Sequence, residues 1–360
     1  MTHRIAVRWQ GLPVSLMMLI IVLAVGTAYA ASTKKALHVE NNGLDTVFCG
    51  ARGAPCRSIS QAIFNASAGD QILVGPGRYG DLDGDGVLGE TGEETGETNF
   101  GCGCILKVDK AVDIQSTHGA AATVLDARNF FTSEQPAAVV RIAANGAVFG
   151  RPDHGFTLTG APRNSGLVTA ATRVTVAGNR SSGNAGGFSI FGSENTIQRN
   201  VAVANNGHGF EMFGQSHIFR ENAAIGNNGE GFLVFGGQSH TMENNVSTAN
   251  GVGFHVFSGS VSLKSNSAVG NADVGILLGQ AATARIGGNN IFANGLVPVQ
   301  SQQTNCGLVN SSGNSIVATN NFWGAATGPG VDPADEVCDI SGSTAFLPFA
   351  QKPFSVEGPR

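Results

Sequence analysis

The sequence predicts an all-β solenoid whose coils repeat every 22 residues. Gly-Phe pairs recur with this spacing at Phe188, Phe210, Phe232 and Phe254, and a second Phe follows each of them three residues later. A fixed period of this length is the signature of a repeat architecture. The composition agrees, because 51 of the 360 residues are Gly and only 13% are charged. Gly in a helix interior costs about 1 kcal/mol relative to Ala, which excludes a helical bundle.

Asparagine recurs in the same register as these Phe residues. The steps are 21 to 23 residues long, and an apolar residue precedes each Asn by three positions. The column consists of Asn179, Asn200, Asn222, Asn245, Asn266 and Asn289. Asn tolerates the left-handed backbone of a turn, and its amide can bond the same amide one coil away. The short strands between these turns bury alternate residues, which only a neighbouring coil can cover.

The run from Asn179 to Gly279 resembles the right-handed parallel β-helix repeats of the pectate-lyase-like superfamily. The opening residues 55–77 and the segment 320–324 also resemble parts of such proteins. The resemblance implies a single-stranded right-handed parallel β-helix over residues 36–350. It does not select an activity, because the superfamily includes lyases, hydrolases, epimerases, a copper-maturation factor and adhesins.

Residues 1–30 have the form of a signal peptide. Two arginines precede the apolar run 16–25, and an A-x-A cleavage site ends at Ala30. The run is too short to cross about 30 Å of hydrocarbon comfortably. We therefore expect an exported protein, secreted, periplasmic or on the cell surface, with no membrane span after cleavage.

The remaining residues, 31–360, are expected to form one β-helix domain. Residues 50–80 form its N-terminal cap, in which Ser58 and Gln61 are typical of a capping box that opens a short helix. This helix is expected to cover the first coil. An acidic loop follows at 81–97, the regular coils occupy 174–295, and a closing segment occupies 315–350.

The mature chain keeps all six cysteines, and an even number in an exported protein indicates disulfides. Proximity favours Cys49–Cys56 and Cys306–Cys338. This leaves Cys102 and Cys104, whose spacing disfavours a bridge to each other. Cleavage of residues 1–30 takes the net charge from −5 to −7, which argues against a nucleic-acid partner.

The acidic loop contains the strongest local motif. Asp81, Asp83 and Asp85 alternate on a Gly-bearing turn, as in the first half of a calcium-binding loop. Gly92 stands where that loop needs a bidentate Glu, so Glu90 or Glu93 would have to replace it. We expect a structural Ca²⁺ there, with a solvated acidic loop as the alternative.

A second candidate site is a group of polar residues on neighbouring coils. The 22-residue step places Glu230 beside His208, and Glu211 lies three residues further along the same strand. A His with two carboxylates can perform general acid–base chemistry. The more frequent explanation is a set of solvated polar residues on the coil surface. The paired aspartates of polygalacturonases are missing from the sequence.

Two further columns have open interpretations. The column of Phe191, Phe213, Phe235 and Phe257 is interpreted as an internal stack, with an exposed ladder for sugar rings as the alternative. His217 and His240 occupy the place of Asn195 in successive coils and are interpreted as outward turn residues, with a metal-binding pair as the alternative.

Two classes of function are compatible with these features. The first is an exported β-helix that binds a polysaccharide or a cell-surface partner without catalysis. The second is a polysaccharide lyase, glycoside hydrolase or epimerase, which would need carboxylates and a basic residue in one groove. The sequence favours the first, because no complete catalytic motif is present.

Overall fold

The computed structural model describes residues 34–96, 103–128, 138–295, 305–331, 333–356 and 358–359. The expected signal peptide and Cys102 lie outside them. Within the described residues the strands form three sheets in which every pair of neighbours is parallel, together with a short helix, α1 (Ile59–Asn65). The all-β solenoid expected from the repeat is confirmed.

Sheet 1 contains one strand from each coil. Its order is β1 (Ala36–Val39), β2 (Gln71–Val74), β5 (Asp113–Ser116), β8 (Val148–Phe149), β11 (Thr175–Ala177), β14 (Thr196–Gln198), β17 (Ile218–Arg220), β20 (His240–Glu243), β23 (Ser260–Lys264), β26 (Thr283–Gly287), β29 (Ser315–Val317) and β31 (Ser343–Ala345).

Sheet 2 is built in the same way. Its order is β4 (Cys104–Val108), β7 (Ala138–Ile142), β10 (Ser165–Thr169), β13 (Gly186–Ile190), β16 (Phe210–Met212), β19 (Phe232–Val234), β22 (Val252–Val256), β25 (Val274–Leu278), β28 (Cys306–Asn310) and β30 (Glu336–Asp339).

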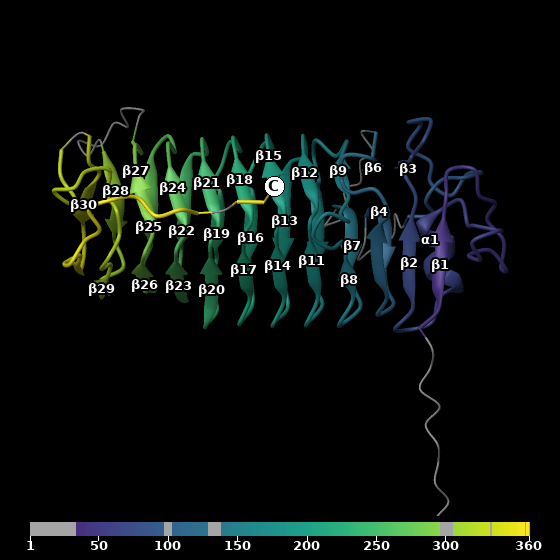
Figure 1. The fold of residues 1–360 in the computed structure, drawn as a ribbon, viewed down its shortest axis with the longest axis horizontal. Coiled ribbons are helices and arrows are strands. Elements are labelled where there is room, and N and C mark those ends of the chain that lie inside the picture. Colours follow the sequence, from purple (N-terminus) through teal and green to yellow (C-terminus); the bar gives the residue numbers. More distant parts are fainter. Residues whose placement is uncertain are drawn as a thin grey trace, which may run out of the picture. The chain divides into compact units, whose positions relative to one another are not determined.

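Sheet 3 completes the coils. Its order is β3 (Gly77–Gly80), β6 (Thr123–Asp126), β9 (Thr157–Thr159), β12 (Arg180–Ser182), β15 (Val201–Val203), β18 (Ala223–Ile225), β21 (Val246–Thr248), β24 (Ser267–Val269) and β27 (Asn290–Phe292). The chain visits sheets 1, 3 and 2 in turn, so each coil lies beside the next one (Figure 1).

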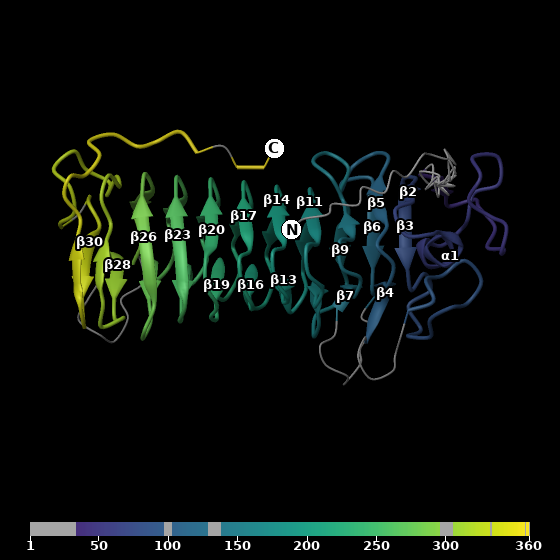
Figure 2. The ribbon, with the colours of Figure 1, turned by 90° about the horizontal axis from the view of Figure 1, so that it is seen from below.

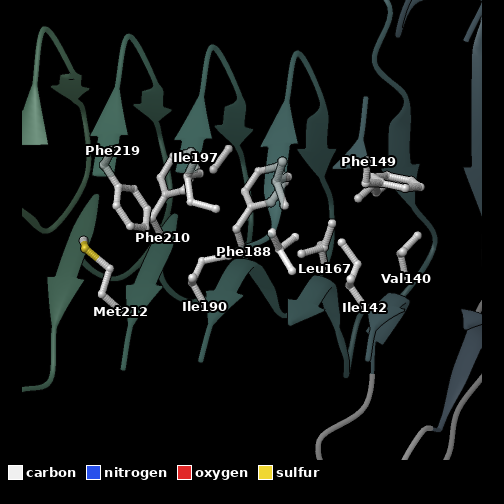
Figure 3. Close-up of a cluster of buried hydrophobic side chains, with 14 of the residues drawn as sticks. Val140, Ile142, Phe149, Leu167, Phe188, Ile190, Ile197, Phe210, Met212 and Phe219 are labelled. Carbon is white, nitrogen blue, oxygen red and sulfur yellow. The ribbon is translucent and has the colours of Figure 1, made fainter. Parts of the chain in front are cut away.

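The core is a set of columns that run from coil to coil. Phe188, Phe210, Phe232 and Phe254 are paired in register and almost fully buried. Their rings stack with centroids 4.8 to 5.0 Å apart, which is the spacing between neighbouring strands. Figure 3 shows Phe188 and Phe210 inside the coils with the apolar residues that pack beside them, among them Ile197. The predicted buried column is confirmed.

The predicted asparagine column is also buried. Each amide donates to the carboxamide oxygen of the next coil, as in Asn200 Nδ2 to Asn222 Oδ1 at 3.1 Å and Asn222 Nδ2 to Asn245 Oδ1 at 2.9 Å. A second ladder, which was not predicted, joins Asn184, Asn205, Asn227, Asn250, Asn271 and Asn294.

The cap helix α1 packs its apolar face on β1, β2 and β4. Ser58 is its N-cap and accepts from the N–H of Gln61 at 3.1 Å, as predicted. The second half of the expected capping box is absent, because the Gln61 side chain bonds Asn65. Asp45 accepts from the N–H of Ser58 in its place.

Both expected disulfides, Cys49–Cys56 and Cys306–Cys338, are present, and Cys104 is also disulfide-bonded. In the part of the chain that is described, no helix has the length and apolar character needed to cross a membrane. Beyond β31 the chain turns back along the coils (Figure 2). There Phe354 exchanges two backbone hydrogen bonds of 2.9 Å with the side chain of Asn290.

Candidate functional site

An elongated cavity of about 1150 Å³ lies on the outer side of sheet 3. Its floor is a column of residues paired from coil to coil, Thr157, Arg180, Val201 and Ala223. They point outward because their neighbours on each strand, such as Ser181, are buried. The cavity therefore runs along the solenoid over several coils.

The wall of this cavity is polar. Arg199 and Glu221 lie in the turns between sheets 1 and 3, and their side chains form an ion pair of 2.5 Å. Arg180 is exposed, so its guanidinium is accessible from the cavity. The C-terminal residues Gly358 and Pro359 also line it.

The same outward column continues beyond the cavity as Val246, Ser267 and Asn290. There the C-terminal tail lies over it, with Phe354 bonded to Asn290 and Gly358 close to Val246. One stretch of the column is thus covered by an extended segment of the protein itself, and the other stretch forms the cavity. We refer to the uncovered stretch as the sheet 3 groove.

The predicted acid–base residues come together on the outer side of sheet 2. Glu230 Oε2 contacts His208 Nδ1, and Glu211 Oε1 lies 3.7 Å from His208 Nε2. The structure adds His255, whose Nδ1 is 3.1 Å from Glu230 Oε1, and Ser189, which donates to Glu211 at 2.8 Å. We refer to these five residues as the His–Glu cluster.

The electrostatics of the His–Glu cluster follow from these contacts. Bonds from His208 and then His255 hold the pKa of Glu230 far below its usual range. The bond to Glu230 raises the pKa of His208. The contacts place the imidazole of His208 between the carboxylates of Glu211 and Glu230. None of the five residues lines the sheet 3 groove.

The acidic loop follows β3 directly. Asp81 is fully buried, and its two carboxylate oxygens accept from the N–H groups of Gly84 and Gly86 at 2.6 and 3.0 Å. Its carboxylate lies within 4.8 Å of those of Asp83 and Asp85, and Asp83 lies equally close to Glu90 and Glu93. The charges of Asp85 and Asp83 raise the pKa of Glu90.

The second Phe column is on the surface, so the internal stack expected from the sequence is wrong. Phe235 and Phe257 are 41% and 53% exposed. Phe191 and Phe213 stack at 4.3 Å, and Phe213 and Phe235 at 4.7 Å. Stacked rings cover each other's faces, so this ladder offers mostly ring edges to a ligand, whereas a sugar ring needs a face.

His217 and His240 are buried, so their interpretation as outward turn residues is also wrong. They extend the column of Asn195: each Nδ1 accepts from the backbone N–H one coil earlier, at 3.3 and 3.4 Å. Each Nε2 is 2.8 Å from a carbonyl oxygen, of Phe213 and Gly236 respectively. Both ring nitrogens are thereby used, and burial lowers the pKa of both imidazoles.

Comparison with known proteins agrees with this architecture. The family described as "Periplasmic copper-binding protein (NosD)" matches residues 154–331, which contain the most regular coils. The chain is a parallel β-helix repeat protein. A search of curated proteins found no match.

Two solved structures are similar to this β-helix protein. The A-module of mannuronan C-5 epimerase AlgE4 from Azotobacter vinelandii is 15% identical, with a TM-score of 0.48 over 81% of this chain and 90% of that one. Pectate lyase Pel9A is 19% identical, with a TM-score of 0.46 over 89% of this chain and 79% of that one.

The residues predicted from the sequence include part of the His–Glu cluster and miss the sheet 3 groove of the β-helix. A signal for the groove was present, because Arg180, Val201 and Ala223 each follow a ladder Asn directly. His255 could have been found from the register, since it aligns with Glu211 two coils earlier.

The buried imidazoles predict acid sensitivity of the β-helix. An unfolded His has a pKa of about 6.5, and His217 and His240 have lower values when folded. The unfolded chain then binds more protons as pH falls below 6.5, so stability declines by up to about 1.4 kcal/mol per pH unit for each imidazole. Above pH 6.5 the two neutral imidazoles make their full contribution to stability.

The double variant His217→Asn, His240→Asn tests this by extending the Asn195 column in its original residue type. Urea unfolding of both proteins between pH 7 and pH 5 is expected to show a smaller decline for the variant. His208 has a raised pKa, so its contribution is lost as pH rises, and it cancels because both proteins keep it. Parallel declines would show that the two imidazoles do not cause the acid sensitivity.

Proposed function

We propose that this protein is an exported, periplasmic or extracellular β-helix that binds a glycan chain in the sheet 3 groove without catalysing a reaction. The observation that carries the proposal is the cavity of about 1150 Å³ along the outer face of sheet 3. The family match, whose name is that of a periplasmic protein, and the disulfides support a place outside the cytoplasm.

The shape of the groove suits a polymer. Its floor residues repeat at the strand spacing of about 4.8 Å, so it is long and straight along the solenoid. The C-terminal tail already lies as an extended chain on the same column at Val246 and Asn290. An extended ligand would continue this line over Ala223, Val201 and Arg180.

The chemistry of the groove suits hydroxyl groups. Thr157, the Arg199–Glu221 pair and the Arg180 guanidinium supply hydrogen-bonding groups, and Val201 and Ala223 supply small apolar contacts. Pockets that combine apolar contact with a few placed polar groups are typical ligand sites. The net charge of −7 expected for the mature chain favours a neutral glycan over a polyanion.

The His–Glu cluster supports binding more than the enzymatic alternative. Inverting hydrolysis needs a water molecule and a sugar between two carboxylates. Here the ring of His208 lies between Glu211 and Glu230, and both nitrogens of that ring face carboxylates. Glu230 is held ionised, which suits an ion-pair network and disfavours a general acid.

The name of the matching family suggests copper as a ligand, but the described residues do not form a suitable copper site. Copper takes imidazole, thiolate or thioether ligands. Every cysteine that the structure describes is disulfide-bonded, and Met212 and Met242 are fully buried. Among the residues described, no group of three converging ligand atoms includes a His. Copper therefore has no part in the proposal.

Titration calorimetry of the exported protein against neutral and acidic polysaccharides tests the proposal. Arg180→Ala should weaken binding about tenfold or more, because a charge-assisted hydrogen bond is worth about 1.5–3 kcal/mol. Lys264→Ala is the matched control, since Lys264 is an exposed cation on sheet 1 outside the groove.

Three outcomes would contradict the proposal. If the protein bound no polysaccharide, a glycan would not be its ligand. If Arg180→Ala and Lys264→Ala lost the same amount of affinity, the sheet 3 groove would not be the binding site. Release of unsaturated or reducing ends from a bound polysaccharide would favour a lyase or a hydrolase, and a change of sugar configuration without cleavage would favour an epimerase.

A further inference from the structure

We propose that the acidic loop is a calcium site, formed by Asp81, Asp83, Asp85, Glu90 and Glu93, and that the bound ion holds the cap helix α1 in place. The site is independent of the sheet 3 groove, whose lining includes none of these residues.

The five carboxylates form two groups that share one member. Oxygens of Asp81, Asp83 and Asp85 lie within 4.8 Å of one another, and those of Asp83, Glu90 and Glu93 do so as well. Asp83 therefore lies between the two halves. Glu93 takes the role that Gly92 cannot fill at the end of the loop.

A second observation points to a ligand at this place. Glu93 is only 4% exposed, and its Oε1 accepts from the N–H of Leu82 at 2.7 Å. Its Oε2 is buried and has no hydrogen-bond partner in the structure. An unpaired carboxylate oxygen in the interior is costly, and a cation bound between Glu93 and Asp83 would satisfy it.

Neighbouring arginines do not perform this task. The side chains of Arg57 and Arg128 lie beside Gly92 and Gly84, so close that a methyl group at either glycine would be 3.3 or 3.4 Å from them. In the described part of the chain neither forms an ion pair with the five carboxylates. Nη1 of Arg57 is buried without a hydrogen-bond partner, and the Arg57 guanidinium lies over the ring of Tyr79.

The donor set selects the class of ion. All five side chains offer oxygen, which suits a hard cation and not zinc or copper. Calcium accepts six to eight oxygens at about 2.3–2.6 Å in flexible geometry, whereas magnesium demands a near-ideal octahedron. Five carboxylates of unequal reach therefore favour Ca²⁺.

Glu94, which follows Glu93, connects the acidic loop to the cap helix by hydrogen bonds. Glu94 is buried and accepts from the N–H groups of Ile59 and Ser60 at 2.8 and 2.7 Å, and from Ser60 Oγ at 2.6 Å. These are the first residues of α1. An ion that fixes Glu93 thus fixes the carboxylate that holds the first turn of the helix.

Titration calorimetry of the chelator-treated mature protein with CaCl₂ tests the site. One ion per chain is expected in the wild type, and Asp83→Asn should abolish binding because Asp83 belongs to both groups. Glu90→Gln should weaken binding about tenfold, the equivalent of about 1.4 kcal/mol. Glu194→Gln, an exposed acid on a distant coil, should leave binding unchanged.

Hydrogen exchange separates the two parts of the proposal. Calcium should slow exchange of the Ile59 and Ser60 amides in the wild type and in Glu194→Gln, but not in Asp83→Asn. Circular dichroism identifies a misfolded variant, and Glu90→Gln then provides the test. If the wild type showed no heat of calcium binding, the proposed site would be wrong. If calcium bound without slowing amide exchange at Ile59 and Ser60, the proposed link to α1 would be wrong.

Discussion

Phe232→Ala is expected to lower the free energy of unfolding by about 3–5 kcal/mol, as buried Phe to Ala changes do in other cores. Phe232 is fully buried, and its ring stacks between those of Phe210 and Phe254 at 4.8 Å on each side. The substitution leaves a cavity between two coils, and the ladder hydrogen bonds of β16, β19 and β22 prevent the coils from collapsing into it. Urea unfolding monitored by circular dichroism measures the loss.

Phe235→Ala is the matched control from the same coil. Phe235 is 41% exposed and stacks on Phe213, so its removal should cost about 1 kcal/mol, the value of an aromatic pair. Equal losses in the two variants would show that burial of Phe232 does not hold the coils together.

The sequence predicted the parts of the fold that repeat. A register of Phe and Asn over several coils has one physical explanation, because a strand that buries Phe188 must place Phe210 beside it. The cap helix was predicted for a different reason, which is local. Its apolar face and its N-cap, Ser58, are local signals that need no knowledge of the rest of the chain.

The turns between strands were predicted less well. Alternation decides the direction of side chains only within a strand, and Phe191 and Phe213 follow the ends of β13 and β16. A Gly after a Phe shows that the chain bends and does not show to which side. His217 continues a column whose first member, Asn195, is buried, and the sequence pattern does not show that this column faces inward.

The candidate site depends on which surfaces remain open, and this is a property of the whole coil stack. The step of 22 residues was enough to bring His208 and Glu230 together. It could not show that the cavity lies over sheet 3, because the cavity depends also on the C-terminal tail, far away in sequence, which lies against β21 and β27.

Asn222→Ala is expected to lower the free energy of unfolding by about 2–6 kcal/mol. The Asn222 side chain donates to Ile197 O at 2.8 Å and to Asn245 Oδ1 at 2.9 Å. It accepts from the backbone and side-chain nitrogens of Asn200 at 3.0 and 3.1 Å. A hydrogen bond is worth about 0.5–1.5 kcal/mol net, so the loss of four gives this range, and the buried N–H of Asn200 is left unpaired.

Asn228→Ala in the same coil is the control, since Asn228 is exposed and its loss should cost within about 0.5 kcal/mol. Asn222→Asp sharpens the test, because a carboxylate accepts but cannot donate to the next coil. The second ladder contains the natural counterpart: it ends at Asp335, which accepts from the amide of Asn294 at 2.8 Å. Within the ladder, Asp would keep the two bonds that it accepts from Asn200 but lose the two that Asn222 donates, and its buried charge would face the oxygens of Ile197 and Asn245, so this variant should also be clearly destabilised. Equilibrium unfolding in urea that finds Asn222→Asp as stable as the wild type would show that the donor half of the ladder contributes nothing.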